Sequence, residues 1–441
     1  MKLQRLEKIY ASVLLVIFAG IVVHAPLTVG LGVLFPDYSL LIKSWKEILM
    51  LLLVPVAVYL VTKQKLWTEL LNDWVSRLII LYAALHFWIA AVAYQGMQAT
   101  FAGLAIDLRY VLFFCLVYVA IKLLPQWRRN MLIAVVIGAF LVVCFATLQL
   151  FLPADILKYI GYSKETITPY LTVDKNPDYV RVNSTLRGPN PLGAYAGMAL
   201  AFLAAALVRA KLKLADRKVL AGTLVFGICS AVALWVSYSR SALVGGLIAV
   251  GVALFITLGR KLSRNSWVAL CVITFALAGA FVAMRGSSFI SNVILHENPN
   301  GGSSISSNDD HVASLQYGVT KLMQQPLGSG VGSTGSASLF GDLPTIVENQ
   351  YLFVAHETGW LGLGLFLVLF AVVLQRLWQR RADWLALGTF ASGIGLGLIG
   401  LLLPVWVDDT VSIIWWGLAA IALAGGRRHG KTAKQKTART A

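Results

Sequence analysis

The sequence predicts an all-α membrane protein with about twelve transmembrane helices. Hydrophobic residues make up 58% of the 441 residues, charged residues make up 13%, and the mean hydropathy is +0.75. Soluble domains average about 45–50% apolar and about 25% charged residues. The apolar residues come in unbroken runs long enough for helices that cross a bilayer, whereas the strands of a membrane barrel alternate with a period of two. These observations exclude soluble, disordered, coiled-coil and β-barrel proteins.

Twelve apolar runs have the length of a transmembrane helix. They lie at roughly 9–34, 41–62, 76–95, 101–123, 131–152, 190–208, 218–236, 241–259, 266–284, 350–375, 384–403 and 406–425. The first run is too long for the apolar part of a signal peptide and has no small-residue cleavage site, so we expect a retained helix. All four cysteines lie inside apolar runs, where they behave as small buried residues, so we expect no disulfide bonds.

The same runs define the predicted organisation. Residues 1–284 hold spans 1–9 and an outer loop at 153–189. A large loop at 285–349 separates spans 9 and 10. Spans 10–12 occupy residues 350–425, and a basic tail follows at 426–441. Long loops in a chain whose other connections are short usually carry function.

Basic residues predict the orientation. Most of the 37 lysines and arginines lie in alternate loops and in the tail, and cytoplasmic loops carry such an excess. We therefore expect both termini in the cytoplasm and the loops 153–189 and 285–349 on the opposite face. The loops also account for the net charge of +17, so we expect no nucleic-acid partner.

A second group of basic residues lies outside these cytoplasmic loops. Its members are Lys43, Lys46, Arg109, Lys158, Lys164, Lys175, Arg181, Arg187, Arg240, Arg285 and Lys321. A charge inside the bilayer costs at least about 2.5–3.5 kcal/mol unless it is paired, hydrated or snorkelling. Several such charges at one depth predict a water-filled cavity that opens to the outer face.

Arg187 and Arg240 are the strongest candidates for binding an anion. Arg187 lies just before span 6 in a Leu-Arg-Gly-Pro sequence, and Arg240 lies in a short Ser-rich turn before span 8. A planar guanidinium suits phosphate oxygens, and the backbone of neighbouring Ser and Gly residues supplies further donors.

Arg109 and Lys46 lie at a similar depth, near Asp107 and Glu47 respectively. All of these cations could instead snorkel, or pair with the nearby carboxylates or a lipid headgroup. Both explanations remain open at this point.

His311 stands out among the six histidines. His24 and His86 lie inside apolar runs and are expected to be hydrogen-bonded core residues. His311 follows Asn308-Asp309-Asp310, which favour a helix start, and precedes an apolar stripe of Val312, Leu315, Val319 and Leu322. Acidic neighbours raise the basicity of an imidazole and orient it, as a general base requires. The aspartates and His311 could instead bind a metal. We favour helix capping for the aspartates, and a solvated surface histidine is the alternative for His311.

A glycine-rich segment follows at 326–335. No strand precedes it and no Lys-Ser/Thr pair ends it, so it is not a nucleotide-binding loop. We expect a tight turn rich in backbone groups. Glu348 and Asn349 then lead into span 10, where polar side chains commonly hydrogen-bond between helices.

Taken in order, these motifs resemble the bacterial O-antigen ligase and O-antigen polymerase superfamily. The resemblance rests on the twelve spans, the large loop before span 10 and a set of short motifs. These are Leu-Arg187-Gly-Pro-Asn-Pro-x-Gly, Ser-Arg240-Ser-Ala, His311, Pro326-Leu-Gly-x-Gly and Glu348-Asn-Gln-Tyr. Ligases carry a histidine at the head of the loop helix, where many polymerases carry another residue, so His311 favours a ligase. O-linked protein oligosaccharyltransferases share the histidine and remain an alternative.

The resemblance implies a glycosyltransferase of the GT-C class in the bacterial inner membrane, with its active site facing the periplasm. It would transfer O antigen from undecaprenyl pyrophosphate to a sugar hydroxyl of lipid A-core, inverting the anomeric centre without a metal or cofactor. His311 would be the catalytic base. The substrate-binding residues would be Arg187, Arg240, Arg109, Arg181, Lys46, Glu348 and Asn349.

Membrane lipids are the remaining expected partners. The non-enzymatic alternative is a flippase or transporter for lipid-linked sugars. Charges halfway across the membrane and paired broken helices would favour transport. The unexplained charges instead gather at the outer ends of the spans, which fits a one-sided reaction better than alternating access.

Reporter fusions test the predicted orientation. A fusion at Lys213 should report the cytoplasm and a fusion at Ser303 the periplasm, because the positive-inside rule places the two loops on opposite faces. The measurement is the activity of a paired cytoplasmic and periplasmic reporter. The same signal at both positions would refute the topology.

Overall fold

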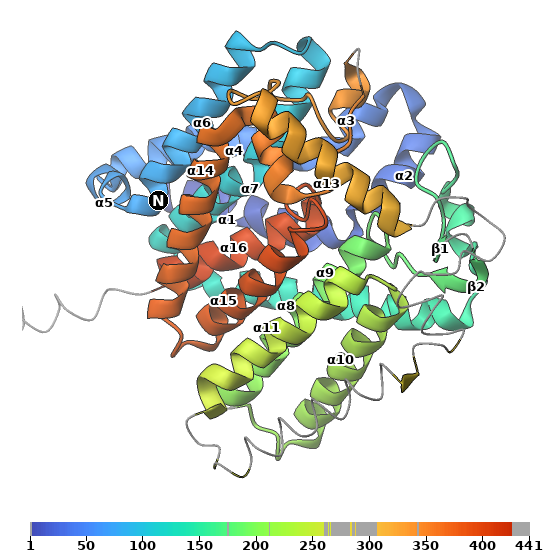
Figure 1. The fold of residues 1–441 in the computed structure, drawn as a ribbon. Coiled ribbons are helices and arrows are strands. Elements are labelled where there is room, and N and C mark those ends of the chain that lie inside the picture. The colour runs from blue at the N-terminus through green and yellow to red at the C-terminus, as the bar shows by residue number, and fades with distance from the viewer. Residues whose placement is uncertain are drawn as a thin grey trace, which may run out of the picture.

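Helices carry most of the chain in the computed structural model (Figure 1). The structure describes residues 2–173, 176–210, 212–259, 307–341 and 344–425, with the isolated positions 263, 265, 283, 284 and 287. The α-helices are α1 (Lys2–Gly20), α2 (His24–Leu34), α3 (Ser39–Lys43), α4 (Trp45–Lys63), α5 (Trp67–Leu71), α6 (Trp74–Val92), α7 (Met97–Leu123), α8 (Trp127–Leu148), α9 (Pro189–Arg209), α10 (Arg217–Val236), α11 (Arg240–Leu258), α13 (Ser307–Gln324), α14 (Gln350–Gln379), α15 (Trp384–Ile399) and α16 (Asp409–Ala424). Two short strands, β1 (Leu171–Val173) and β2 (Asn176–Arg181), form an antiparallel hairpin.

The prediction of an all-α polytopic membrane protein is confirmed. Within the described residues, nine helices are long and apolar enough to cross a membrane, and α15 and α16 are shorter apolar helices. These eleven correspond to predicted spans. The remaining predicted span, 266–284, lies outside the described residues apart from its last two positions. In the described part of the chain, Cys115, Cys144 and Cys229 are free, as expected.

The last two helices are shorter than the sequence predicts because residues 400–408 form a turn between them. Pro404 cannot donate a backbone hydrogen bond, and the Asp408 side chain caps α16 by accepting from Val411 N at 2.9 Å. Gln350 of α14 binds this turn through both its backbone and its side chain. Its N–H donates to Gly400 O at 2.8 Å, and its Oε1 accepts from Trp406 N at 2.8 Å.

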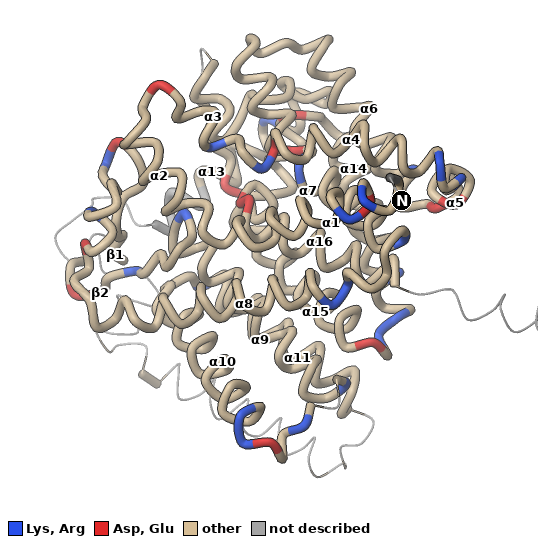
Figure 2. The backbone as a smooth tube through the Cα atoms, turned by 180° about the vertical axis from the view of Figure 1, so that it is seen from behind, with Lys and Arg blue, Asp and Glu red and all other residues tan. Residues whose placement is uncertain are grey.

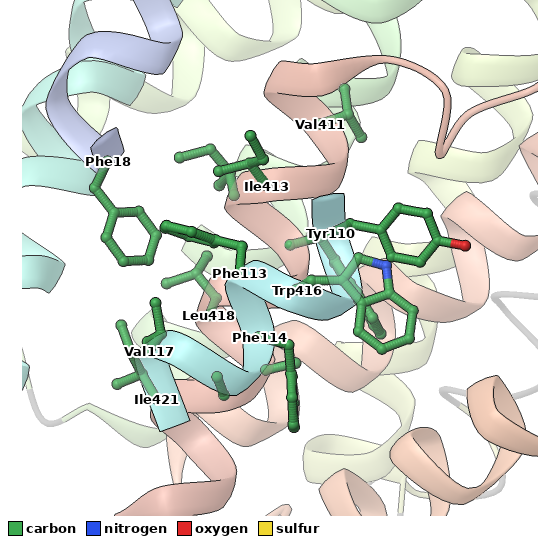
Figure 3. Close-up of a cluster of buried hydrophobic side chains, with 14 of the residues drawn as sticks. Phe18, Tyr110, Phe113, Phe114, Val117, Val411, Ile413, Trp416, Leu418 and Ile421 are labelled. Carbon is green, nitrogen blue, oxygen red and sulfur yellow. The ribbon is translucent and has the colours of Figure 1, made fainter. Parts of the chain in front are cut away.

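The helix α16 forms the centre of the bundle, since every residue from Asp409 to Ala424 is buried. Figure 3 shows its side chains packed among residues of α7 and Phe18 of α1. The rings of Trp415 and Trp416 lie edge to face with centroids 5.2 Å apart, and Trp406 lies 5.1 Å from Trp415. Aromatic pairs in such arrangements contribute about 0.5–1.5 kcal/mol each beyond the area they bury.

Glycines bring α9, α11 and α15 into backbone contact. A Cβ placed on Gly197 of α9 would lie 2.9 Å from the Cα of Gly246 in α11. A Cβ placed on Gly245 of α11 would lie 2.7 Å from the carbonyl oxygen of Gly395 in α15. Helices in membranes associate closely where small residues face each other, because lipid supplies little hydrophobic driving force.

The two ends of the bundle differ in composition. At the end that we call the basic end, the first turn of α8 contains Arg128 and Arg129, and α10 begins with Arg217 and Lys218. Figure 2 shows lysine and arginine concentrated at helix ends and connecting turns, while most of the chain is uncharged. The opposite end, where α9, α11, α14 and α16 begin, is called the site end.

The glycine-rich turn at 326–335 packs against α14 at the site end. Gly359 interrupts α14 with a φ of 67°, a value that glycine adopts without strain. At this kink, Ser329 N–H donates to His356 O at 2.6 Å and Trp360 N–H donates to Pro326 O at 2.9 Å. The turn is therefore held by backbone groups, as the sequence predicts.

Substitution of Gly245 by leucine should destabilise the protein, because a side chain cannot fit against the backbone of α15. Overpacking of this kind costs about 1–3 kcal/mol. The measurement is the fraction of detergent-solubilised protein that stays monodisperse after heating. Gly364→Leu is the matched control, since a Cβ at Gly364 meets no atom within 4 Å. Equal heat resistance of the two variants would contradict the close contact of α11 with α15.

Candidate functional site

A cavity of about 360 Å³ lies at the site end of the bundle. Its polar side chains are Arg187, Asn190, Glu348 and Asp408. Its apolar wall comes from Ile346, Ile399, Leu403, Pro404, Val405, Val407 and Val411 among others. Small-molecule sites commonly have volumes of about 300–1,000 Å³, with a few polar groups in an apolar wall. We call this space the Arg187 cavity.

Arg187 reaches the cavity because the residues before it are anchored in the bundle. Ser184 Oγ donates to Val142 O at 2.6 Å, and Thr185 Oγ1 donates to Val22 O at 2.6 Å. Leu186 is fully buried, whereas Arg187 is exposed. The fixed segment thus places an exposed arginine at the cavity, just before the first turn of α9.

Asp408 is a cavity residue that the sequence analysis missed. It lies in the turn before α16, and its carboxylate interacts with the charges of Arg187 and Arg109. A signal for it exists in the sequence. Asp408 and Asp409 are adjacent acidic residues within an apolar run, and such residues in membrane segments usually have a partner or a function.

Behind the cavity lies a group of buried ionisable residues, which we call the buried charge network. It comprises His24, Lys46, Glu47, Arg109 and Asp409. Lys46 is only 2% exposed, and its Nζ lies 3.0 Å from Asp409 Oδ2 and 3.2 Å from Glu47 Oε1. Asp409 Oδ2 is also 2.9 Å from His24 Nε2. The network therefore joins α2 and α4 to the first residue of α16.

Arg109 connects this network to the cavity wall. Its Nη1 lies 3.6 Å from Glu47 Oε1, and its Nη2 donates to the carbonyl oxygen of Val407. The sequence left open whether Lys46 and Arg109 bind an anion or pair with nearby carboxylates. The structure shows that both pair with carboxylates of the protein. Both side chains are buried, and neither lines the cavity, whereas Val407 and Asp408 do.

Arg181 and Arg240 lie beside the first turns of α9. Arg181 donates through Nε to Ser237 O at 3.0 Å and through Nη2 to Asn190 Oδ1 at 2.6 Å. Arg240 is the first residue of α11. The preceding turn packs on α9, because a Cβ on Gly193 would lie 2.6 Å from Ser237 Oγ. Arg181 thus orients a side chain of the cavity, and Arg240 lies at the start of a neighbouring helix.

Glu348 and Asn349 connect the cavity to two other elements. The N–H of Glu348 donates to Ser314 Oγ of α13 at 3.2 Å. Asn349 Oδ1 caps α14 by accepting from Tyr351 N at 2.9 Å, and its Nδ2 donates to Leu401 O at 2.6 Å. Glu348 lines the cavity, while the described bonds of Asn349 hold α14 and the 400–408 turn in place.

The helix α13 packs on α14. A Cβ on Gly318 would lie 2.9 Å from Leu352 Cδ1, so the two helices approach closely at Gly318. Glycine has no side chain and therefore allows this close approach. Val319, a member of the predicted apolar stripe, is 50% exposed.

His311 belongs to the first turns of α13, and Ser314 follows it by about one helical turn. The helix begins at Ser307, earlier than the expected cap at Asn308. The side chains of residues 307–312 lie outside the described part, and with them the roles predicted for Asp309, Asp310 and His311. The backbone nevertheless places His311 on the helix that contacts Glu348.

The prediction that His24 and His86 are hydrogen-bonded core residues is confirmed. His24 bonds within the buried charge network, and His86 Nδ1 lies 2.8 Å from Tyr82 O. His86 Nε2 also lies 3.7 Å from Asp107 Oδ2. Among the residues with described side chains, no cluster of three or more His, Cys, Asp or Glu side chains is arranged to hold a metal ion.

Comparison with known families gives one match. Residues 225–367 match the model of a family described as O-antigen ligase, and this match supports membership of the O-antigen ligase superfamily. The matched segment contains Arg240, His311 and Glu348, whereas Arg187 precedes it. No curated protein matches the chain.

Replacement of Lys46 by methionine should destabilise the fold strongly, because Asp409 then keeps a buried charge without its lysine. Removal of one partner from a buried ion pair costs about 3–5 kcal/mol. The measurement is the melting temperature of the protein in detergent. Lys122→Gln is the control: its partner Glu69 is 55% exposed, and such pairs contribute about 0–1 kcal/mol. Addition of Asp409→Asn to the Lys46 variant should recover part of the loss, and a parental melting temperature for Lys46→Met alone would refute the role of the network.

Proposed function

We propose that this chain, whose residues 225–367 match the O-antigen ligase family, transfers O-antigen polysaccharide from undecaprenyl pyrophosphate to a sugar hydroxyl of lipid A-core. The reaction would belong to lipopolysaccharide biosynthesis in the bacterial inner membrane, at its periplasmic face. The observation that carries the proposal is the Arg187 cavity, where an exposed guanidinium and Glu348 share one space beside the helix that contains His311.

Arg187 would bind the diphosphate of the donor. Its guanidinium can make two parallel hydrogen bonds to phosphate oxygens. The carboxylate of Asp408, which lines the same cavity, interacts with the charge of Arg187. Fixed positive charge stabilises the negative charge that develops on the leaving diphosphate. Arg240 would add a second cation from the start of α11, and Arg181 would orient Asn190.

Lys46 and Arg109 would act from behind the cavity wall rather than by direct contact. Both cations are bonded within the buried charge network. They would hold the turn that carries Asp408, through the Lys46–Asp409 pair and the bond from Arg109 to Val407. Asn349 would act similarly, by fixing the turn at 400–408 against α14.

His311 would be the general base for the acceptor. As the acceptor oxygen bonds to the anomeric carbon, the bond from that carbon to the phosphate oxygen breaks. Undecaprenyl pyrophosphate leaves with the electron pair, and the hydroxyl proton passes to His311. In-line attack inverts the anomeric centre. Histidine suits this task because its unperturbed pKa is about 6.5, near the working pH. The arginines supply the positive charge, so the reaction needs no divalent ion.

Both substrates carry lipid chains and can reach the site end of the bundle through the membrane. The cavity wall is largely apolar, which suits a site that excludes water from the reacting groups. The concentration of polar cavity residues at one end of the bundle supports a reaction at a single membrane face.

Purified protein with lipid-linked O antigen and lipid A-core tests the proposal. His311→Ala should lower turnover by about 10²–10⁴-fold with donor binding nearly unchanged, because a positioned base acts on the chemical step.

Arg187→Ala should weaken donor binding as well as turnover. Arg187→Lys should restore only part of the donor binding, since a point charge cannot make two parallel hydrogen bonds. Lys158→Ala is the control, because Lys158 pairs with Asp155 on an exposed surface. EDTA should leave transfer intact.

Three outcomes would contradict this assignment. Parental turnover of His311→Ala would remove the histidine as base and make Glu348 the next candidate. Elongation of the lipid-linked sugar in place of transfer to lipid A-core would indicate a polymerase. Transfer to a protein hydroxyl would indicate a protein oligosaccharyltransferase.

A further inference from the structure

A second cavity, of about 540 Å³, lies in the half of the bundle next to the basic end. Its lining comes from the starts of α8, α10 and α15, the later turns of α9 and the middle of α16. The wall is almost wholly apolar and includes Val135, Phe140, Phe202, Phe226 and Leu385. We call it the lower cavity.

The mouth of the lower cavity is cationic. Lys218 lines the cavity itself, and an adjoining recess of about 570 Å³ contains Arg128 and Arg129. The two spaces share Leu132, Val136 and Trp384. Arg128 is paired with Asp383 at 2.7 Å. Lys218 and Arg129 are exposed, and neither belongs to an ion pair between residues that the structure describes.

The lower cavity is open space between the helices. A Cβ placed on Gly222, which lines the cavity from α10, would meet no atom within 4 Å.

We propose that the lower cavity binds an acyl chain of an anionic phospholipid, with the lipid phosphate at Arg129 and Lys218. An apolar recess with a cationic mouth complements a molecule that joins an apolar chain to a phosphate. Basic pockets between helices at the cytoplasmic face are typical binding sites for anionic headgroups. The flexible stems of arginine and lysine let their charges reach the headgroup layer.

The position of the mouth separates this site from the proposed donor site. Arg187 precedes the first residue of α9, whereas Arg129 and Lys218 lie near its other end. Since α9 has 21 residues, its ends lie roughly 30 Å apart at about 1.5 Å per residue. A donor with its diphosphate at Arg187 therefore cannot also place that diphosphate at Arg129 and Lys218. The inference does not depend on the proposed function.

Native mass spectrometry of the full chain in detergent tests the headgroup. Phosphatidylglycerol should bind more tightly than phosphatidylcholine with the same acyl chains. Arg129→Gln and Lys218→Gln should each weaken phosphatidylglycerol binding about five-fold, in line with the usual attraction of one basic residue to anionic lipid. Each change should weaken phosphatidylcholine binding less, because the choline ammonium offsets the charge of its phosphate. Equal affinity of the parent protein for both lipids would overturn the proposal.

A cavity-filling variant tests the acyl chain. Gly222→Phe should abolish the tight phosphatidylglycerol adduct, because the ring occupies the space of the chain. Gly251→Phe on α11 is the matched control, since a Cβ there also meets no atom within 4 Å, and it should bind phosphatidylglycerol as the parent does. Retention of the adduct by Gly222→Phe would overturn the proposal. Undecaprenyl phosphate is measured with the same variant. If Gly222→Phe lost undecaprenyl phosphate but kept phosphatidylglycerol, the proposal would also be overturned, because the cavity would then hold a polyprenyl chain.

Discussion

The buried ion pair between Lys46 and Asp409 is the interaction on which the site end depends. Two charges taken out of water are tolerated only if each has a close partner and further hydrogen bonds. Lys46 meets this condition through Asp409 and Glu47, and Asp409 meets it through Lys46 and His24. Because Asp409 is the first residue of α16, the pair fixes the start of the central helix against α2 and α4.

That fixed point determines the shape of the Arg187 cavity. Asp408 directly precedes Asp409, and Val407 receives the hydrogen bond from Arg109. On the other side, Gln350 of α14 and its capping residue Asn349 bind the same turn through Trp406, Gly400 and Leu401. The wall that faces Arg187 is therefore held by side chains from both halves of the chain, although the wall itself has no regular secondary structure.

The transmembrane helices were predictable because the bilayer sets both their length and their composition. The predicted span at 190–208 differs by only one residue at each end from α9, Pro189–Arg209. The turn at 400–408 was not predictable in the same way, since its apolar residues resemble those of a span. Contacts with distant residues, among them Gln350, Asn349 and Arg109, hold the turn in place. The same limit applies to the charges. The sequence placed Lys46 and Arg109 in one layer with Glu47, but their pairing depends on α16, which lies far away in the chain.

The complete burial of α16 has a consequence for the way the protein is assembled. A ribosome makes this helix after every other helix that the structure describes, so the earlier helices enter the membrane before their central member exists. Until α16 arrives, the slot beside α7 must be occupied by lipid or by a looser arrangement of its neighbours, and Lys46 has no Asp409. Insertion of α16 would then displace that lipid, bring Asp409 to Lys46 and complete the wall of the Arg187 cavity. The Arg187 cavity is therefore complete only after the last helix that the structure describes has been made.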